Sequence, residues 1–124
     1  MPDFLRTIPV LRSFDEAKAK EFYLDFLGFT VDFEHRFEPD MPLYMGVSRG
    51  DLRLHISEHF GDAMPGSCVF IEMTGLREFH AELIGKRFKF ARPGINPGHS
   101  GPGAISLNLT DPFGNKLRFE ERAP

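Results

Sequence analysis

The sequence predicts an α+β fold built from two tandem βαβββ modules. Strand-like alternation and helical periodicity follow one another in that order, and the same order then occurs a second time. Residue identities repeat at one constant offset: Glu21-Phe22 with Glu78-Phe79, Leu27-Gly28 with Ile84-Gly85, and Phe33 with Phe90. The chain has 124 residues, the length of one domain, so we expect a single domain over residues 1–124 with modules at about residues 1–60 and 66–124.

The first module begins with a strand over about Arg6–Leu11 and continues into a helix. The run Ser13-Phe14-Asp15-Glu16 has the form of a capping box, in which Ser13 accepts a hydrogen bond from the Glu16 amide and the Glu16 carboxylate reaches back. Gly28 is suited to end the helix, because glycine adopts a left-handed backbone at little cost. The helix has one apolar face, which consists of Ala19, Phe22, Tyr23 and Phe26.

Three strands and a loop complete the first module. Apolar residues alternate with polar ones from Phe29 to Glu34. Two further strands, over Leu43–Val47 and Leu52–Ile56, flank a hairpin-like turn at Ser48–Asp51. The segment His59–Gly66 contains two glycines, a proline and an aspartate, so we expect it to be a loop.

The second module repeats this order of elements. Its strands are expected over Cys68–Met73, around Phe88 and Phe90, over Ile105–Thr110 and over Leu117–Glu121, with a helix over Leu76–Ile84 that ends at Gly85. The segment Arg92–Gly103 holds three prolines and four glycines, too many for regular structure. His99, in this segment, is placed either to close over a ligand or to face solvent.

The composition excludes several classes of protein. The formal net charge is −3 and no block of basic residues occurs, which argues against nucleic acid as the main partner. No apolar run approaches the roughly 20 residues of a membrane span, and the acidic start Met1-Pro2-Asp3 is unlike a signal peptide. Cys68 is the single cysteine, and we expect it to be buried in its apolar strand. These features predict a cytoplasmic protein without a membrane partner.

Phenylalanine dominates the aromatic residues, with 14 Phe, 2 Tyr and no Trp. Such rings belong in a core, an oligomer interface or an apolar ligand pocket. We expect Phe14, Phe22 and Phe26 to pack between helix and sheet. The rings that lie at strand ends and in loops are better candidates for stacking on a ligand, and these are Phe33, Phe37 and Phe60.

Three segments of the chain resemble the glyoxalase/bleomycin resistance family, also called the vicinal oxygen chelate superfamily. They are Ile8-Pro9-Val10-Leu11, the stretch from Glu21-Phe22-Tyr23 to Leu27-Gly28-Phe29, and Asp111-Pro112-Phe113-Gly114-Asn115 before Leu117-Arg118-Phe119. The resemblance covers nearly the whole chain and implies βαβββ modules whose strands form a curled mixed sheet around a cavity. The first and last segments are most similar to the bleomycin resistance proteins. They imply a homodimer with ligand crevices at or near the interface, often with an exchanged N-terminal strand.

Alternation along the strands divides each sheet into two faces. Leu52, Leu54 and Ile56 should pack on a helix and leave Arg53 and His55 on the other face. This second face is polar, so it is either a solvated outer surface or, as the family fold implies, the lining of a ligand cavity. We expect ligand contact from Phe33, Tyr44, Arg53, His55, Ser106, Asn108, Arg118 and Glu120. Phe33 is included although its register groups it with Phe29 and Val31, because the chain can bend at Glu34-His35.

Metal-dependent members of the family carry a histidine on the first strand of each module and a glutamate on the last strand. The resemblance places Ile8 at the first of these positions and Arg118 at the last, and neither side chain suits a metal ion. We therefore expect no metal and no other cofactor. The spacing of His55 and His59 leaves a metal site open as an alternative, although a neutral, hydrogen-bonding His55 is the simpler interpretation.

These observations predict a small-molecule binding protein of the bleomycin resistance type, which sequesters an antibiotic or metabolite without turnover. Bleomycin binders of this family use tryptophan stacking and a strongly acidic crevice. This chain lacks tryptophan and places Arg53 and Arg118 on the predicted cavity face, so an anionic or aromatic metabolite is an alternative to bleomycin. The other hypotheses are a metal-dependent glyoxalase-type lyase, dioxygenase or thiol transferase, and a protein with no small ligand.

Overall fold

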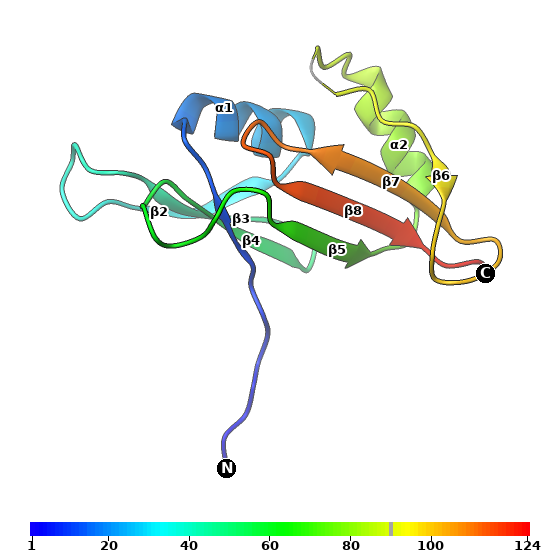
Figure 1. Ribbon diagram of the computed structural model, residues 1–124, viewed down its shortest axis with the longest axis horizontal. Coiled ribbons are helices and arrows are strands. Elements are labelled where there is room, and N and C mark those ends of the chain that lie inside the picture. Colours follow the sequence, from blue (N-terminus) through cyan, green and yellow to red (C-terminus); the bar gives the residue numbers. More distant parts are fainter. Residues whose placement is uncertain (90) are drawn as a thin grey trace.

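Two four-stranded mixed sheets form the frame of the molecule (Figure 1). The computed structural model describes residues 1–89 and 91–124. The first sheet has the order β1-β4-β3-β2, and its strands are β1 Val10–Arg12, β2 Thr30–His35, β3 Tyr44–Arg49 and β4 Leu52–Ser57. The second sheet has the order β5-β8-β7-β6, and its strands are β5 Cys68–Glu72, β6 Asn96–Pro97, β7 Ile105–Thr110 and β8 Lys116–Glu121.

Both sheets have the same topology. β1 is parallel to β4 and β5 is parallel to β8, whereas the other neighbouring strands are antiparallel. The predicted α+β fold with two βαβββ modules is therefore confirmed. Phe90, which the sequence places on a strand of the second module, lies outside the described residues.

The helices lie on one side of the strands (Figure 1). α1 (Glu16–Lys20) continues directly into η1 (Glu21–Phe26), a π-helical segment, and α2 (Leu76–Gly85) is the helix of the second module. Gly28, with a φ of 77°, follows the first helix as predicted. Among the described residues, no helix combines the length and apolar character needed to cross a membrane.

The buried core fills the space between the helices and the sheets. Of the three residues expected to pack on a helix, Leu54 and Ile56 are buried and Leu52 is partly buried. The other buried residues of the strands and their ends are Leu43, Met45 and Val47 in the first module, and Leu107, Leu109, Leu117 and Phe119 in the second. They pack with Ala19, Phe22, Tyr23 and Phe26 of the first helix, and with Leu76, Phe79 and Leu83 of α2. Each sheet therefore keeps one face away from the core. We call these the first open face (β1–β4) and the second open face (β5–β8).

The predicted capping box at the start of α1 is wrong. Asp15 is the N-cap, and its carboxylate accepts a hydrogen bond from the Lys18 amide at 2.9 Å. The Ser13 amide instead donates to the carbonyl of Ser57 at 2.8 Å, so it extends the pairing of β1 with β4. Phe14 was expected in the core, but this register leaves it 58% exposed, with its ring against the edge of Phe113.

Four further expectations for the strands are corrected. The first strand covers Val10–Arg12 instead of Arg6–Leu11. The Pro9 carbonyl still accepts a hydrogen bond from the His55 amide of β4, and the residues before it extend away from the body (Figure 1). Phe88 lies outside any strand and stacks on the core ring of Phe26 at 4.5 Å. Asn96–Pro97 forms the edge strand β6 within the segment expected to be irregular. Cys68 was expected to be buried but is exposed.

One buried polar cluster ties the two modules together. Asp111 accepts hydrogen bonds from the Tyr23 hydroxyl at 2.6 Å, from the amides of Phe113 and Asn115, and from the Asn115 side chain. The Asn115 side chain also donates to the carbonyl of Arg12 at 2.8 Å. Burial and the neighbouring carboxylate raise the pKa of Tyr23, so its hydroxyl keeps its proton and donates. The turn between β7 and β8 is therefore fixed to the first helix and to β1.

Candidate functional site

A β-bulge in β2 brings Phe33 to the first open face. Val31 pairs with Val47, and Phe33 pairs with the next residue of β3, Gly46, so Asp32 is the extra residue of the bulge. The bulge reverses the alternation after Val31, and Phe33 then lies in one row with Gly46 and His55. The sequence register grouped Phe33 with Phe29 and Val31, and the bulge is the physical reason why that grouping is wrong.

Phe33, Tyr44 and His55 form a surface that we call the aromatic platform. The Phe33 ring is parallel to that of Tyr44 to within 17° at 6.2 Å, and it meets the edge of the His55 ring at 5.2 Å. The ring of Phe33 rests over Gly46, where a Cβ atom would lie only 2.3 Å from it. Only glycine leaves room for this arrangement. Phe33 remains 42% exposed, so the platform offers a flat apolar surface to a planar partner.

A hydrogen bond fixes the orientation of the other two rings. The Tyr44 hydroxyl lies 2.6 Å from His55 Nδ1. Burial and the charge of Asp62 raise the pKa of Tyr44, which keeps the phenol protonated. With a neutral imidazole, Tyr44 donates to Nδ1 and the His55 proton resides on Nε2, where it is available to a ligand.

Arg53 lies beside the platform with its charge partly compensated. Its guanidinium is 3.4 Å from the carboxylate of Asp32, the bulge residue. Asp32 also accepts a hydrogen bond from the Ser48 hydroxyl at 2.8 Å. Arg53 therefore lies on the predicted face and is paired with Asp32. It is near the start of β4, whereas Tyr44 lies opposite Ser57 at the end of that strand.

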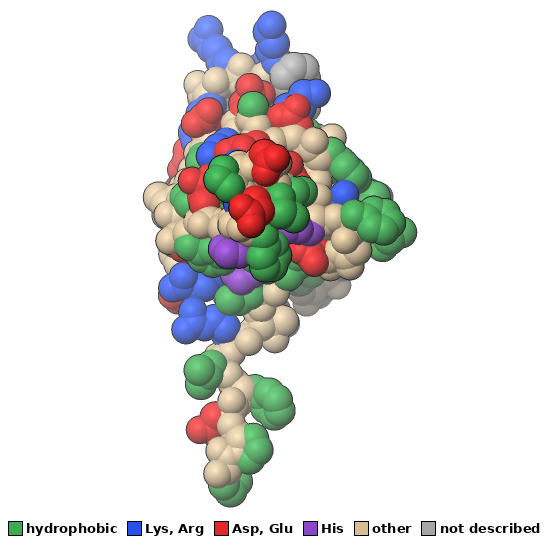
Figure 2. Space-filling model, turned by 90° about the vertical axis from the view of Figure 1, so that its left-hand side faces the viewer, with side chains coloured by type: hydrophobic (Ala, Val, Ile, Leu, Met, Phe, Trp, Pro, Cys, Tyr) green, Lys and Arg blue, Asp and Glu red, His purple; other side chains and the backbone are tan. Residues whose placement is uncertain are grey.

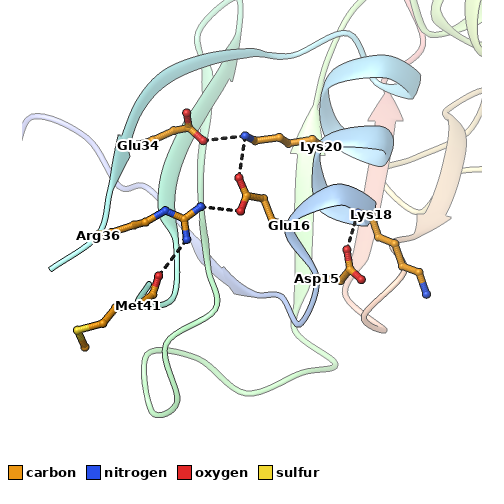
Figure 3. Close-up of polar contacts among 7 residues, drawn as sticks. All are labelled: Asp15, Glu16, Lys18, Lys20, Glu34, Arg36 and Met41. Carbon is orange, nitrogen blue, oxygen red and sulfur yellow. Dashed lines mark hydrogen bonds and ion pairs between the residues drawn. The ribbon is translucent and has the colours of Figure 1, made fainter. Parts of the chain in front are cut away.

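A polar network attaches the β2 side of the platform to the first helix (Figure 3). Lys20 bridges Glu16 at 3.0 Å and Glu34 at 2.8 Å, and Arg36 contacts Glu16 at 2.5 Å. Hydrogen bonds from Arg36 and Lys20 lower the pKa of Glu16, and the bond to Glu34 raises the pKa of Lys20. Arg36 also donates to the carbonyl of Met41 at 2.9 Å. These contacts hold β2, and with it Phe33, at a fixed distance from α1.

The second open face contains a pocket of about 300 Å³. Four of the predicted ligand-contact residues line it: Ser106, Asn108, Arg118 and Glu120. Phe70, His99, Leu109, Thr110 and Lys116 complete its lining. The expected ligand contacts included neither Phe70 nor Lys116, although both alternate onto this face.

Glu120 holds a loop over the end of this pocket. Glu120 is only 3% exposed. Its carboxylate accepts hydrogen bonds from the backbone amides of His99 and Ser100, both at 2.8 Å. Hydrogen bonds from Ser100 and from the backbone of His99 lower the pKa of Glu120. A Cβ atom at Gly98 would lie 2.9 Å from the Glu120 carboxyl carbon, so the loop approaches closely only because residue 98 is glycine.

The eight predicted residues thus form two groups on separate sheets. Phe33, Tyr44 and His55 meet on the first open face, with Arg53 beside them. Ser106, Asn108, Arg118 and Glu120 meet in the pocket on the second open face. Gly46 and Gly98, which make room for Phe33 and Glu120, were missed, because close approach of a distant side chain leaves no signal in local alternation.

Comparison with protein families assigns the fold. The family model described as "Glyoxalase superfamily protein" matches residues 2–124. The chain belongs to the glyoxalase superfamily. Comparison with the curated proteins finds no match.

Solved structures place this glyoxalase superfamily member beside bleomycin-binding proteins. It is similar to the bleomycin-binding protein from bleomycin-producing Streptomyces verticillus, complexed with copper(II)-bleomycin, at 32% identity and a TM-score of 0.70, covering 99% of this chain and 100% of that one. A second bleomycin-binding protein, complexed with bleomycin, has 27% identity and a TM-score of 0.68 over 97% of this chain and 100% of its own. The bleomycin resistance determinant encoded on transposon Tn5 shares the fold at 24% identity, with a TM-score of 0.69 over 98% and 100% of the two chains. The predicted resemblance to the glyoxalase/bleomycin resistance family is confirmed.

Ile8 and Arg118 are the residues that the family resemblance assigns to metal-ligand positions. Arg118 lines the pocket, and Ile8 precedes β1. Among residues 1–89 and 91–124, no group of three His, Cys, Asp or Glu side chains is arranged to hold a metal ion. His55 is bonded to Tyr44, whereas the His59 ring meets the edge of Phe37 at 6.0 Å.

Proposed function

We propose that this chain is a bleomycin resistance-type binding protein, which sequesters an antibiotic or metabolite without turnover. The aromatic platform carries the proposal, because Phe33 is preformed over Gly46 as an exposed, planar stacking surface. Relatives at 32% and 27% identity bind bleomycin, which supports a ligand of this general kind. A flat ligand gains apolar burial on the platform and hydrogen bonds from the polar residues around it.

The division of the site between two sheets favours a homodimer. In this proposal, the first open face of one copy lies against the second open face of the other, and each ligand is enclosed by both chains. Met1, Phe4 and Leu5 are fully or largely exposed, as expected if this segment packs on a partner. Figure 2 views the end with the β2–β3 and β4–β5 loops, where hydrophobic and histidine side chains gather. Phe37 and Phe60 of these loops are exposed and support the same conclusion.

Binding without turnover can be measured directly. Isothermal titration with bleomycin, copper(II)-bleomycin and a panel of planar antibiotics and metabolites should yield at least one ligand that binds at one molecule per chain. Mass spectrometry should then recover that ligand unchanged. Phe33→Ala should weaken the binding, whereas Phe14→Ala, which removes an exposed ring on the helix side, should not.

Two results would overturn the proposal. The first is consumption of a bound ligand by protein that carries near one metal ion per chain, which would instead support a metal-dependent lyase, dioxygenase or thiol transferase. The second is the absence of binding across the whole panel, which would support a protein with no small ligand. A monomer by light scattering at micromolar concentration would overturn the dimeric arrangement alone.

A further inference from the structure

We infer that the pocket on the second open face binds an anionic group, so that the ligand is a planar acid carrying a carboxylate, sulfonate or phosphate. The inference rests on the proposed function and names the class of molecule that this site selects. It follows from the charges that remain available in the pocket after the contacts within the chain are counted.

Two cations of β8 face the pocket without a counter-ion. Lys116 and Arg118 line it, and both side chains are exposed. Among the described residues, no ion pair involves either side chain. Their cross-strand neighbours on β7 are Thr110 and Asn108, which are uncharged. An anion can therefore enter without displacing an internal partner.

Among the described residues that line the pocket, Glu120 is the only one with a carboxylate, and this carboxylate is already engaged. Both oxygens of Glu120 accept hydrogen bonds from backbone amides of the loop, one from His99 and one from Ser100. Glu72, opposite Glu120 on β5, lies 3.4 Å from Arg122. Among the charged groups that face this region, the two carboxylates have partners and the two cations of the pocket do not. The imbalance favours a negatively charged guest.

On the first open face, by contrast, the cation Arg53 has a counter-ion within the chain. Arg53 lies two residues before His55 on β4, as Arg118 lies two residues before Glu120 on β8. The Arg53 guanidinium, however, is paired with the Asp32 carboxylate at 3.4 Å. Phe70 lies directly opposite Arg118 on β5 and provides an aromatic surface beside the free guanidinium. A planar acid can place its ring against an aromatic side chain and its charged group in the fork of Arg118.

A series of naphthalenes tests the charge preference at constant ring size. The probes are 2-naphthoate, 2-naphthamide and 2-naphthylmethylammonium, titrated into the wild-type protein at pH 7.5 by isothermal calorimetry. We expect the carboxylate to bind at least tenfold more tightly than the amide, and the ammonium to bind most weakly. Amide chemical shifts should move in β7 and β8 on addition of the carboxylate.

Matched variants assign the preference to the pocket. Arg118→Gln should lower the affinity for 2-naphthoate by about tenfold or more and leave the affinity for 2-naphthamide within about twofold. Lys116→Gln should act in the same direction with a smaller loss. Arg77→Gln removes the same charge from an exposed position on α2 and should change neither affinity. Circular dichroism of each variant verifies that the fold is retained.

The outcomes separate this inference from the proposed function. Binding of all three naphthalenes with equal affinity, or tighter binding of the ammonium, overturns the anion preference and leaves small-molecule binding intact. An unchanged preference in both Arg118→Gln and Lys116→Gln overturns the assignment to this pocket. Failure of every naphthalene to bind at 1 mM would count against the anion site, and together with an empty antibiotic panel it would overturn both proposals.

Discussion

The two open faces share one topology and carry opposite chemistry. In the first, the row across β2, β3 and β4 reads Phe33, Gly46 and His55. In the second, the row across β6, β7 and β8 reads Asn96, Ser106 and Glu120. The first row presents an aromatic ring to the outside, whereas the second row turns its carboxylate under a loop. A repeated strand topology therefore does not produce a repeated site, because the residues at corresponding positions differ and decide what each face can bind.

Each face depends on a glycine, which lies in a strand in the first module and in a loop in the second. Gly46 lies within the sheet, beneath the ring of Phe33, whereas Gly98 lies in the loop, above the carboxylate of Glu120. The Phe33 ring over Gly46 is 42% exposed. The carboxylate beside Gly98 is buried and held by two backbone amides. The absence of a side chain thus makes room for an exposed ring in one module and for a buried carboxylate in the other.

The largest effect on the free energy of unfolding is expected at the Asp111 cluster, which joins the two modules. Asp111→Ala removes the acceptor of the Tyr23 hydroxyl and of three groups in the β7–β8 turn, and leaves buried donors without partners. We expect the free energy of unfolding in urea to fall by about 3–4 kcal/mol. Asp51→Ala, in the corresponding turn of the first module, is the control and should cost less than about 0.5 kcal/mol, because Asp51 is exposed. Equal losses in the two turns would show that the cluster does not join the modules.

Alanine at each glycine should have a different effect on stability beside the exposed ring than beside the buried carboxylate. Gly98→Ala forces a Cβ atom to within 2.9 Å of Ala104 and Glu120, and we expect it to lower the free energy of unfolding by about 1–3 kcal/mol. Gly46→Ala should cost less than about 1 kcal/mol, because Phe33 can rotate away. The loss at Gly46 should disappear in a Phe33→Ala background, which a double-mutant cycle measures. Persistence of that loss would mean that the Phe33 ring is not what occupies the space over Gly46.

The engaged carboxylate of the second face predicts a dependence on pH. The pKa of Glu120 is lowered from its ordinary value of 4.5 in the folded protein, so its bonds stabilise the fold above pH 4.5 and are lost as the pH falls through the lowered pKa. Urea unfolding between pH 6 and 3 should therefore show a steeper loss for the wild type than for Glu120→Gln. Glu16 and Glu82 also have lowered pKa values and contribute equally to both proteins. Parallel curves would show that the loop contacts do not depend on the charge.

The smallest effect is expected at the aromatic platform. Tyr44→Phe removes the hydrogen bond to His55 Nδ1, and we expect a loss of less than about 1 kcal/mol because water can replace the hydroxyl at this half-buried position. Nitrogen chemical shifts of His55 should move from the Nε2-protonated tautomer toward a mixture. Tyr23→Phe makes the same chemical change in the core and should cost more, since the Asp111 carboxylate there is buried. Unchanged His55 shifts in Tyr44→Phe would rule out Tyr44 as the donor.

Local alternation was sufficient to assign the two faces of the regular strands. Tyr44, His55, Asn108 and Arg118 lie where a period of two residues places them, since side chains in an unbroken strand alternate regardless of what surrounds the sheet. Phe33 does not follow this alternation, because a bulge in β2 adds one residue.

Features that depend on distant segments could not be predicted in this way. Ser13 was assigned to a capping box, but its amide is taken by Ser57 on β4. The burial of Glu120 results from the loop around Gly98, and that loop contains no regular pattern from which its course could be inferred. In both cases, a partner far along the chain decides the role of the residue.

The cluster around Asp111 has a consequence for how the chain reaches its final state. Tyr23 and Asp111 are 88 residues apart in sequence, and Arg12 and Asn115 are 103 apart. During synthesis, the first helix is complete long before Asp111, the acceptor of the Tyr23 hydroxyl, has been made. Tyr23 and the Arg12 carbonyl therefore lack these hydrogen-bond partners until the β7–β8 hairpin has been synthesised. The two modules, which share one topology, therefore depend on each other, and we expect fragments cut between them to fold only in each other's presence.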